Sequence, residues 1–330
     1  MAETANIAGV AELVSKDIFR YFLWHTHPKK DDNFSCLIAT HKSGSGKQKK
    51  THPTDVVFSY DDPYLGERVH LLTDLKSYAK NSISATSIRN ALKSLAISVE
   101  CAKQSEEWKK KFGVLTHEAH CVRGLLFVHN HDGQAGDQFT NELKTVNTRT
   151  LPIAPGDVIH FLAPEDIQRL FTVANDLMRL KAEGELPTSY TFYYPDLVLH
   201  RRSGDSWEQP ATIESLAGPF LLIKHKSSEK AASGFLVYYN RKGSTVEEFE
   251  YLIDCFSRFQ MIDSSERLRI RVCRADASND IKSNLSLAIK KYVKAWGFGQ
   301  EREDILSRIT IDRVPGIATN YNPGDVGWRT

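Results

Sequence analysis

The sequence predicts an α/β protein with two domains, and three observations support this. With 330 residues, 41% hydrophobic and 25% charged, the chain is long enough for two globular domains. Short β-branched and apolar runs alternate with stretches whose apolar residues repeat at helical spacing. A polar stretch, Ser203–Pro210, separates residues 1–205 from residues 211–330. We therefore expect a larger first domain and a smaller α/β second domain.

A β-hairpin over residues 53–78 is the centre of the predicted first domain. Two apolar runs flank a connection rich in turn-forming residues, which favours two antiparallel strands. Asp55 opens the first strand, and Asp74 and Lys76 stand near the end of the second. Residues two apart in a strand project from the same face, so Asp74 and Lys76 are expected side by side.

A divalent cation gives these charged residues a chemical reason to be where apolar ones would be expected. Two carboxylates on adjacent strands repel each other unless a hard cation such as Mg²⁺ accepts their oxygens. The carbonyl of Leu75 is a third candidate oxygen ligand. Lys76 would add a positive charge that orients a water or stabilises a phosphate. An exposed ion pair between Asp74 and Lys76, of little consequence, is the alternative.

The residues Pro53-Thr54-Asp55 and Asp74-Leu75-Lys76 resemble the motif of the PD-(D/E)XK nuclease superfamily, although Thr54 separates the proline from the aspartate. The resemblance implies a restriction-endonuclease-like mixed-sheet core flanked by helices. It also implies phosphodiester hydrolysis with Mg²⁺ or Mn²⁺, with DNA favoured over RNA as the substrate. Asp55, Asp74 and Leu75 would hold the metal, and Asp55, Asp74 and Lys76 would be catalytic.

The elements around the hairpin follow the order helix, three strands, helix, strand that this family requires. The resemblance extends over roughly residues 7–130. Apolar spacing predicts a helix over residues 7–24, in which Glu12 is a further catalytic candidate or a solvated residue. The other expected elements are a strand at 33–40, a helix at 84–111, strands at 122–128 and 157–162, a helix at 164–183 and a strand at 191–199 that completes the domain.

A basic loop at residues 41–52 leads directly into Asp55. Its lysines are candidates for contacts with backbone phosphates, or else decorate a solvated hairpin tip. Two basic residues one turn apart on the predicted helix at 84–111 are further candidates. The proposed nucleic-acid contacts are Lys42, Lys47, Lys49, Lys50, Arg89 and Lys93.

The sequence of residues 211–330 predicts a small module of two strands, a helix, a strand, a helix and a strand. It contains no compact cluster of catalytic residue types. We therefore expect it to bind a protein partner or a second copy of the chain. Its predicted elements are strands at 220–225 and 234–239, a helix at 245–260, a strand at 268–273, a helix at 281–296 and a strand at 305–312.

Bulk properties narrow the functional classes. The net charge of +2 means that nucleic-acid affinity must come from local patches. The sequence predicts no membrane span and no secretion signal. Five widely spaced cysteines without a C-x-x-C pair fit reduced thiols in the cytoplasm and predict no zinc site.

Two main functional hypotheses stay open at this point, beside a third in which the chain is a different Mg²⁺-dependent enzyme of phosphate chemistry, for example one that acts on nucleotides. One is a metal-dependent endonuclease; a two-domain chain of this kind, without helicase or methylase motifs, resembles the effector of a bacterial antiviral defence or mobile-element system. The other is a catalytically silent scaffold that uses the nuclease fold to bind nucleic acid or protein. Convergence of Asp55, Asp74 and Lys76 on one site would favour the nuclease.

Overall fold

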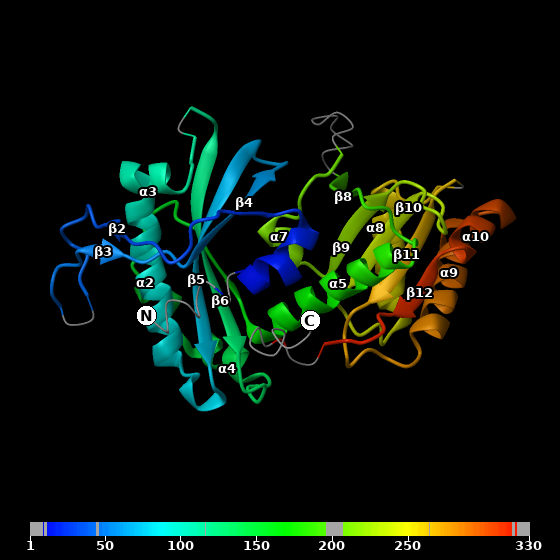
Figure 1. Cartoon of the computed structure of the whole chain (residues 1–330). Coiled ribbons are helices and arrows are strands. Elements are labelled where there is room, and N and C mark those ends of the chain that lie inside the picture. Colours follow the sequence, from blue (N-terminus) through cyan, green and yellow to red (C-terminus); the bar gives the residue numbers. More distant parts are fainter. Residues whose placement is uncertain are drawn as a thin grey trace. The chain divides into compact units, whose positions relative to one another are not determined.

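The computed structural model describes residues 9, 12–43, 46–115, 117–195, 207–263, 265–318 and 321. They form two compact units: unit 1 extends to Phe171 and includes Tyr321, and unit 2 begins at Thr172. Figure 1 labels the elements of both units. Within the described part of the chain, every helix is too short or too polar to cross a membrane.

Unit 1 is built on a mixed five-stranded sheet in the order β1-β4-β5-β6-β7. β1 (His25–Thr26) and β4 (Val56–Asp62) are antiparallel, as are β4 and β5 (Glu67–Tyr78). β5, β6 (His120–Asn130) and β7 (Ile159–Leu162) are parallel. The predicted hairpin is thus present as β4 and β5, and β5 is the central strand.

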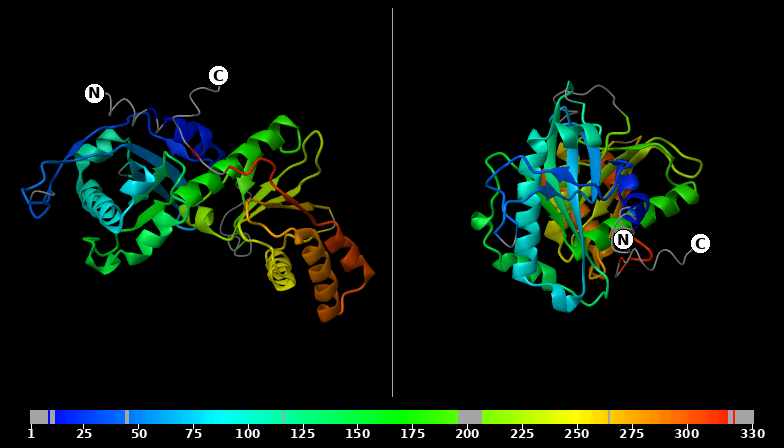
Figure 2. Two further views of the ribbon diagram at one scale, coloured as in Figure 1. Left: turned by 90° about the horizontal axis from the view of Figure 1, so that it is seen from below. Right: turned by 60° about the vertical axis from the view of Figure 1, so that its left-hand side comes forward.

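Helical segments cover both faces of this sheet. On one face, α2 (Ala85–Gln104) packs its apolar side against Val57, Leu72 and Leu126 (Figure 2). On the other, the ring of Phe19 lies 4.6 Å from that of Phe58, centroid to centroid, in η1 (Phe19–Phe22). Side chains alternate between the faces along each strand, so residue parity decides which layer a residue joins.

The contact between α2 and β6 is close because residue 124 is glycine. A Cβ atom at Gly124 would lie 2.7 Å from Cδ1 of Ile159 and 3.0 Å from Cγ2 of Val99. Neither approach is compatible with ordinary packing, so the absence of a side chain sets the spacing between helix and sheet.

Several predicted elements of unit 1 differ from those observed. The single helix predicted at 84–111 is two helices, α2 and α3 (Glu106–Lys111), because the Ser105 hydroxyl accepts the N–H of Trp108 and caps a new helix. The strand predicted at 33–40 is only β2 (Phe34–Ser35), paired with β3 (Thr51–His52). After β6 the chain forms α4 (Gln138–Thr145) and η3 (Thr148–Thr150), and η2 (Lys80–Ser82) precedes α2.

At the N-terminus the predicted helix over 7–24 is shorter. Residues 12–17 are helical, followed by η1, and residues 7, 8, 10 and 11 lie outside the described residues.

Unit 2 contains a second mixed sheet in the order β12-β11-β10-β9-β8. Its strands are β8 (Tyr190–Phe192), β9 (Phe220–His225), β10 (Gly234–Tyr239), β11 (Arg267–Val272) and β12 (Thr310–Arg313). Its helices are α7 (Ile213–Ala217), α8 (Val246–Arg258), α9 (Ile281–Trp296) and α10 (Gln300–Ser307). The apolar faces of α8 and α9 pack on the sheet and form the core. Residues 305–307, expected in a strand, instead end α10.

The division between the units falls earlier than the predicted linker at 203–210. It lies within α5 (Pro164–Ala182), and the strand expected to complete the first domain pairs with β9 as β8. Pairing with a strand that lies later in the chain assigns β8 to unit 2. Residues 196–199 of that predicted strand and 203–206 of the linker lie outside the described residues. The mixed α/β fold class is confirmed.

Candidate active site

Asp55 lies where β4 begins, beside the open edge of β5. Val56, the first residue of β4, pairs with Thr73 of β5. The next residues of β5, Asp74 and Leu75, therefore have no partner in β4. Oδ2 of Asp55 accepts a hydrogen bond of 2.7 Å from the N–H of Leu75 in that gap. The side chain of Asp55 is therefore fixed against β5, and the residue is only 7% exposed.

Asp74 and Lys76 project from β5 on the face covered by α2. Nζ of Lys76 lies 2.5 Å from Oδ1 of Asp74, with side-chain exposures of 35% and 14%. The two-residue spacing thus places both charges side by side, as predicted. Leu72 has the same parity and lies in the core under α2. The partly buried ion pair thus follows the apolar Leu72 on the face that α2 covers.

Asp55 and Asp74 line one small pocket, and each influences the charge of the other. Burial, followed by the charge of Asp74 and a hydrogen bond with its carboxyl group, raises the pKa of Asp55 to about 7. The Leu75 N–H and the charge of Lys76 oppose this rise. For Lys76, burial lowers the pKa, but Asp74 and Asp55 outweigh burial and leave the pKa raised. The structure therefore brings all three predicted residues together.

Two serines of α2 and one lysine of the basic loop complete the surroundings of this site. Ser94 and Ser98 line the small pocket that also contains Asp55 and Asp74. Lys49 is half-buried; its pKa is lowered by burial and by Lys76, while Asp74 opposes the change. The sequence offered no signal for the serines, since a helix turn facing the sheet is known only once the fold is known.

The other predicted site residues lie elsewhere. Glu12 is 66% exposed and forms an ion pair with Lys30. Arg89 donates a hydrogen bond of 3.2 Å to Thr150. Exposed side chains are found at Lys42, Lys47, Lys50 and Lys93. Of the four loop lysines, Lys49 is the one whose charge interacts with the Asp74–Lys76 pair.

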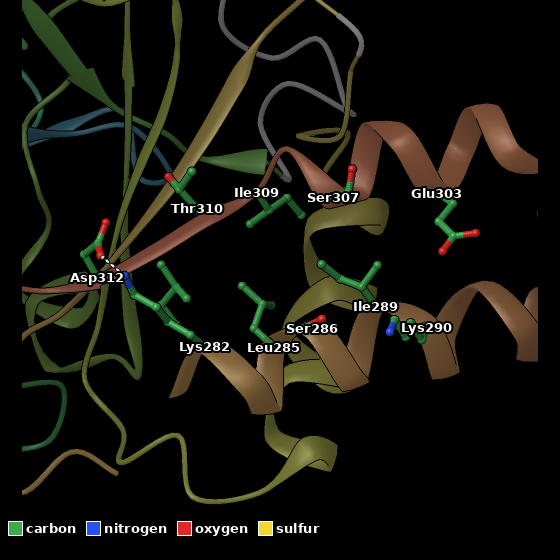
Figure 3. A pocket seen from close by; sticks show the side chains of 11 residues that line it. Lys282, Leu285, Ser286, Ile289, Lys290, Glu303, Ser307, Ile309, Thr310 and Asp312 are labelled. Carbon is green, nitrogen blue, oxygen red and sulfur yellow. Dashed lines mark ion pairs between the residues drawn. The ribbon is translucent and has the colours of Figure 1, made fainter. Parts of the chain in front are cut away.

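Unit 2 contains a pocket of about 370 Å³ between α9, α10 and β12. Figure 3 shows Leu285, Ile289 and Ile309 among its lining side chains, with Lys282 directed at Asp312. These last two residues form an ion pair of 2.7 Å. The pocket walls mix apolar and charged groups, and the carboxylate of Asp312 is already paired with a lysine.

The hairpin, the mixed sheet and the Asp55, Asp74 and Lys76 cluster define a PD-(D/E)XK nuclease domain. Residues 1–166 match the family model described as the GAPS4 protein PD-(D/E)XK nuclease domain, and the chain belongs to this family. Comparisons with curated proteins and with solved structures gave no match. The resemblance inferred from the hairpin motif is therefore confirmed at the level of the family.

Proposed function

We propose that the protein is a metal-dependent endonuclease that hydrolyses phosphodiester bonds, with DNA as its substrate. The observation that carries this proposal is the meeting of the Asp55 and Asp74 carboxyl groups beside Lys76. Membership of a nuclease family supports the reaction class. The preference for DNA rests on the resemblance alone.

The donor set fits a hard divalent cation, Mg²⁺ or Mn²⁺. Two carboxylates in a partly buried site repel each other, and a cation between them would relieve this repulsion. The N–H and C=O of one residue leave a strand at the same edge, so the Leu75 carbonyl faces the edge where its N–H meets Asp55. Asp55, Asp74 and Leu75 would thus hold the ion.

When bound, the cation would activate a water molecule and polarise the scissile phosphate. Lys76 would place its ammonium beside the negative charge that develops on the phosphate, where a fixed charge stabilises the transition state. Lys49 would add a second positive charge at the same place, since its ammonium already interacts with Asp74 and Lys76. The exposed lysines Lys42, Lys47 and Lys50, with Arg89 and Lys93, would contact the more distant backbone phosphates.

The cellular role that we propose is that of a cytoplasmic effector in bacterial antiviral defence. Residues 211–330 would supply the contacts to a partner protein or to a second copy of the chain. Their large exposed apolar side chains Tyr251, Leu287 and Trp296 support this assignment. Light scattering compares the molar mass of Trp296→Ser with that of the unaltered chain. If α9, which ends at Trp296, takes part in self-association, the variant should associate less.

Cleavage assays test the proposed reaction. Plasmid DNA, single-stranded DNA and RNA are each incubated with the full chain in Mg²⁺ and in chelator. We expect DNA cleavage that requires the cation and falls by at least 100-fold in Asp74→Asn and in Lys76→Ala.

A second lysine–aspartate pair in unit 1 provides the matched controls. Lys103 on α2 and Asp157, which precedes β7, form an ion pair with side-chain exposures of 33% and 4%, comparable to the pair at the site. Lys103→Ala and Asp157→Asn should leave cleavage within about threefold of the unaltered chain, since neither residue lies in the site. Cleavage that survives both site substitutions would refute the mechanism. No cleavage of any substrate would favour the scaffold function.

A further inference from the structure

A group of two cysteines and two histidines lies beside the candidate active site and plays no part in the proposed reaction. Cys36 follows β2, His41 lies in the basic loop, His52 ends β3 and Cys101 lies on α2. One ligand atom from each of the four residues lies within 4.8 Å of every other. Figure 1 shows β2, β3 and α2 side by side, which explains how such separated residues meet.

The measured separations match a tetrahedral zinc site. Nδ1 of His41 lies 3.5 Å from Sγ of Cys36 and 3.3 Å from Nε2 of His52. With zinc–nitrogen and zinc–sulfur bonds of ordinary length, a tetrahedron places two nitrogens about 3.3 Å apart and a nitrogen and a sulfur about 3.5 Å apart. These two separations are those that a single ion requires, and the other ligand atoms lie within 4.8 Å of one another.

Both histidines are oriented for ligation by a second hydrogen bond. Nε2 of His41 lies 3.1 Å from Oε2 of Glu100, and Nδ1 of His52 lies 3.1 Å from Oγ of Ser98. In each ring the remaining nitrogen is the one that points into the group. Metal-binding histidines are typically held in this way, by a carboxylate or another acceptor behind the ring.

The burial of the four residues and the type of their ligand atoms are also those of a structural site. His41, His52 and Cys101 are buried, and Cys36 is half-buried. Zn²⁺ prefers two thiolates and two imidazoles, whereas Mg²⁺ prefers oxygen ligands.

We propose that Cys36, His41, His52 and Cys101 bind one structural Zn²⁺. Binding replaces the protons of the two thiols, which are released to solvent, and forms two zinc–sulfur and two zinc–nitrogen bonds. With four protein ligands, the ion has no open position for a substrate. The ion would link His41 and His52, the two ends of the basic loop, to Cys101 on α2.

The position of this site gives it a consequence for the nuclease. Lys49 lies between the two histidines in the sequence, and its N–H donates a hydrogen bond of 2.8 Å to the carbonyl of His41. The pKa of its ammonium is influenced by Cys36 and Cys101 of the group and by Asp74 and Lys76 of the candidate active site. Zinc thus holds the lysine beside the carboxylates of the active site.

The cysteine spacing predicted no zinc site, and this expectation considered only pairs close together in the sequence. The ligands come instead from four segments that span residues 36–101. Only the pairing of β2 with β3, and the packing of both beside α2, brings them together.

Metal analysis of the purified full chain tests the proposal. Elemental mass spectrometry should find about one zinc per unaltered chain. The zinc content should fall at least tenfold in Cys36→Ser, Cys101→Ser and His52→Gln. Cys121→Ser is the matched control, because Cys121 is a half-buried cysteine of unit 1 outside the group. Asp74→Asn is the second control, and it should keep its zinc while losing cleavage. This separates failure of the zinc site from failure of the proposed nuclease site.

Cobalt titration of the unaltered chain, after zinc is removed, is independent of the folding of any variant. Co²⁺ should produce thiolate charge-transfer absorption, which Zn²⁺ abolishes and excess Mg²⁺ does not. Hydrogen exchange of the peptide that carries His41 and His52 should slow on zinc addition. The proposal is overturned by a chain that takes up neither metal. It is also overturned by zinc that persists in both cysteine variants or is lost in Asp74→Asn, or by a disulfide between Cys36 and Cys101.

Discussion

Substitution of Asp55 by asparagine should stabilise the metal-free protein at alkaline pH and leave it inactive. The folded state keeps a proton on Asp55 up to about pH 7, because the side chain is buried beside Asp74, whereas the unfolded chain releases it near 3.8. Asparagine has the same shape and no charge. Its Oδ1 can still accept the Leu75 N–H, and its amide can donate to Asp74.

The size of the effect follows from the pKa difference. A folded pKa raised from 3.8 to about 7 corresponds to a penalty of about 4 kcal/mol in the free energy of unfolding. The penalty is absent below the unfolded pKa and grows as pH rises, until it is complete above the folded pKa. The advantage of Asp55→Asn should therefore increase by about 2 to 3 kcal/mol between pH 5 and pH 8.

Urea unfolding at these two pH values, in chelator, measures this advantage. Asp61→Asn provides a control of opposite sign, since hydrogen bonds from Arg68 lower the pKa of Asp61. Asp61→Asn should be the less stable protein at both pH values. Saturating Mg²⁺ should stabilise the unaltered chain, by about 2.7 kcal/mol at 100 times the dissociation constant, and Asp55→Asn much less. An advantage of Asp55→Asn that does not change with pH would refute the burial argument.

Three further predictions follow from the packing and the charges. Lys49→Ala should reduce cleavage by about 10- to 100-fold with little loss of DNA affinity, whereas the triple alanine variant of Lys42, Lys47 and Lys50 should lower the salt dependence of binding by up to about one unit of slope per lost contact. Equal effects of the two variants in binding and single-turnover assays would contradict this distinction. Asp176→Ala should lower the free energy of unfolding, measured in urea, by about 3 kcal/mol. The buried Asp176 carboxylate accepts hydrogen bonds from Arg271 at 2.7 and 2.9 Å and from Tyr238 at 3.0 Å. A loss below about 1 kcal/mol would show that this network is dispensable. Gly124→Ala should cost about 1 to 3 kcal/mol through overpacking against Ile159, and Gly299→Ala, where nothing lies within 4 Å, should be nearly neutral; similar melting temperatures for the two variants would argue against the close contact.

Local sequence signals predicted most of the elements. β9, β10 and α9 were predicted with the same bounds that the structure shows, because β9 and β10 are short apolar runs and the apolar residues of α9 repeat at helical spacing. The hairpin was predicted because turn residues separate two apolar runs, and the face shared by Asp74 and Lys76 followed from strand geometry.

Features that depend on distant pairing were not predicted. β8 reads as the last strand of the first domain until β9 is known to pair with it. Among four similar lysines in the basic loop, only the fold distinguishes Lys49, whose environment is set by α2 and β5. The same applies to the ligands of the proposed zinc site. Each arrangement is created by packing between segments far apart in the chain.

Manganese binding measures most directly whether Asp55 and Asp74 hold one divalent cation. Electron paramagnetic resonance of free Mn²⁺ can be followed while the ion is titrated into the unaltered chain, Asp55→Asn and Asp74→Asn. We predict about one Mn²⁺ per unaltered chain and an affinity at least tenfold weaker in each variant, because the two carboxylates share the ion. Cys101→Ser should retain the Mn²⁺ site. An affinity that neither Asp55→Asn nor Asp74→Asn changes would contradict the account.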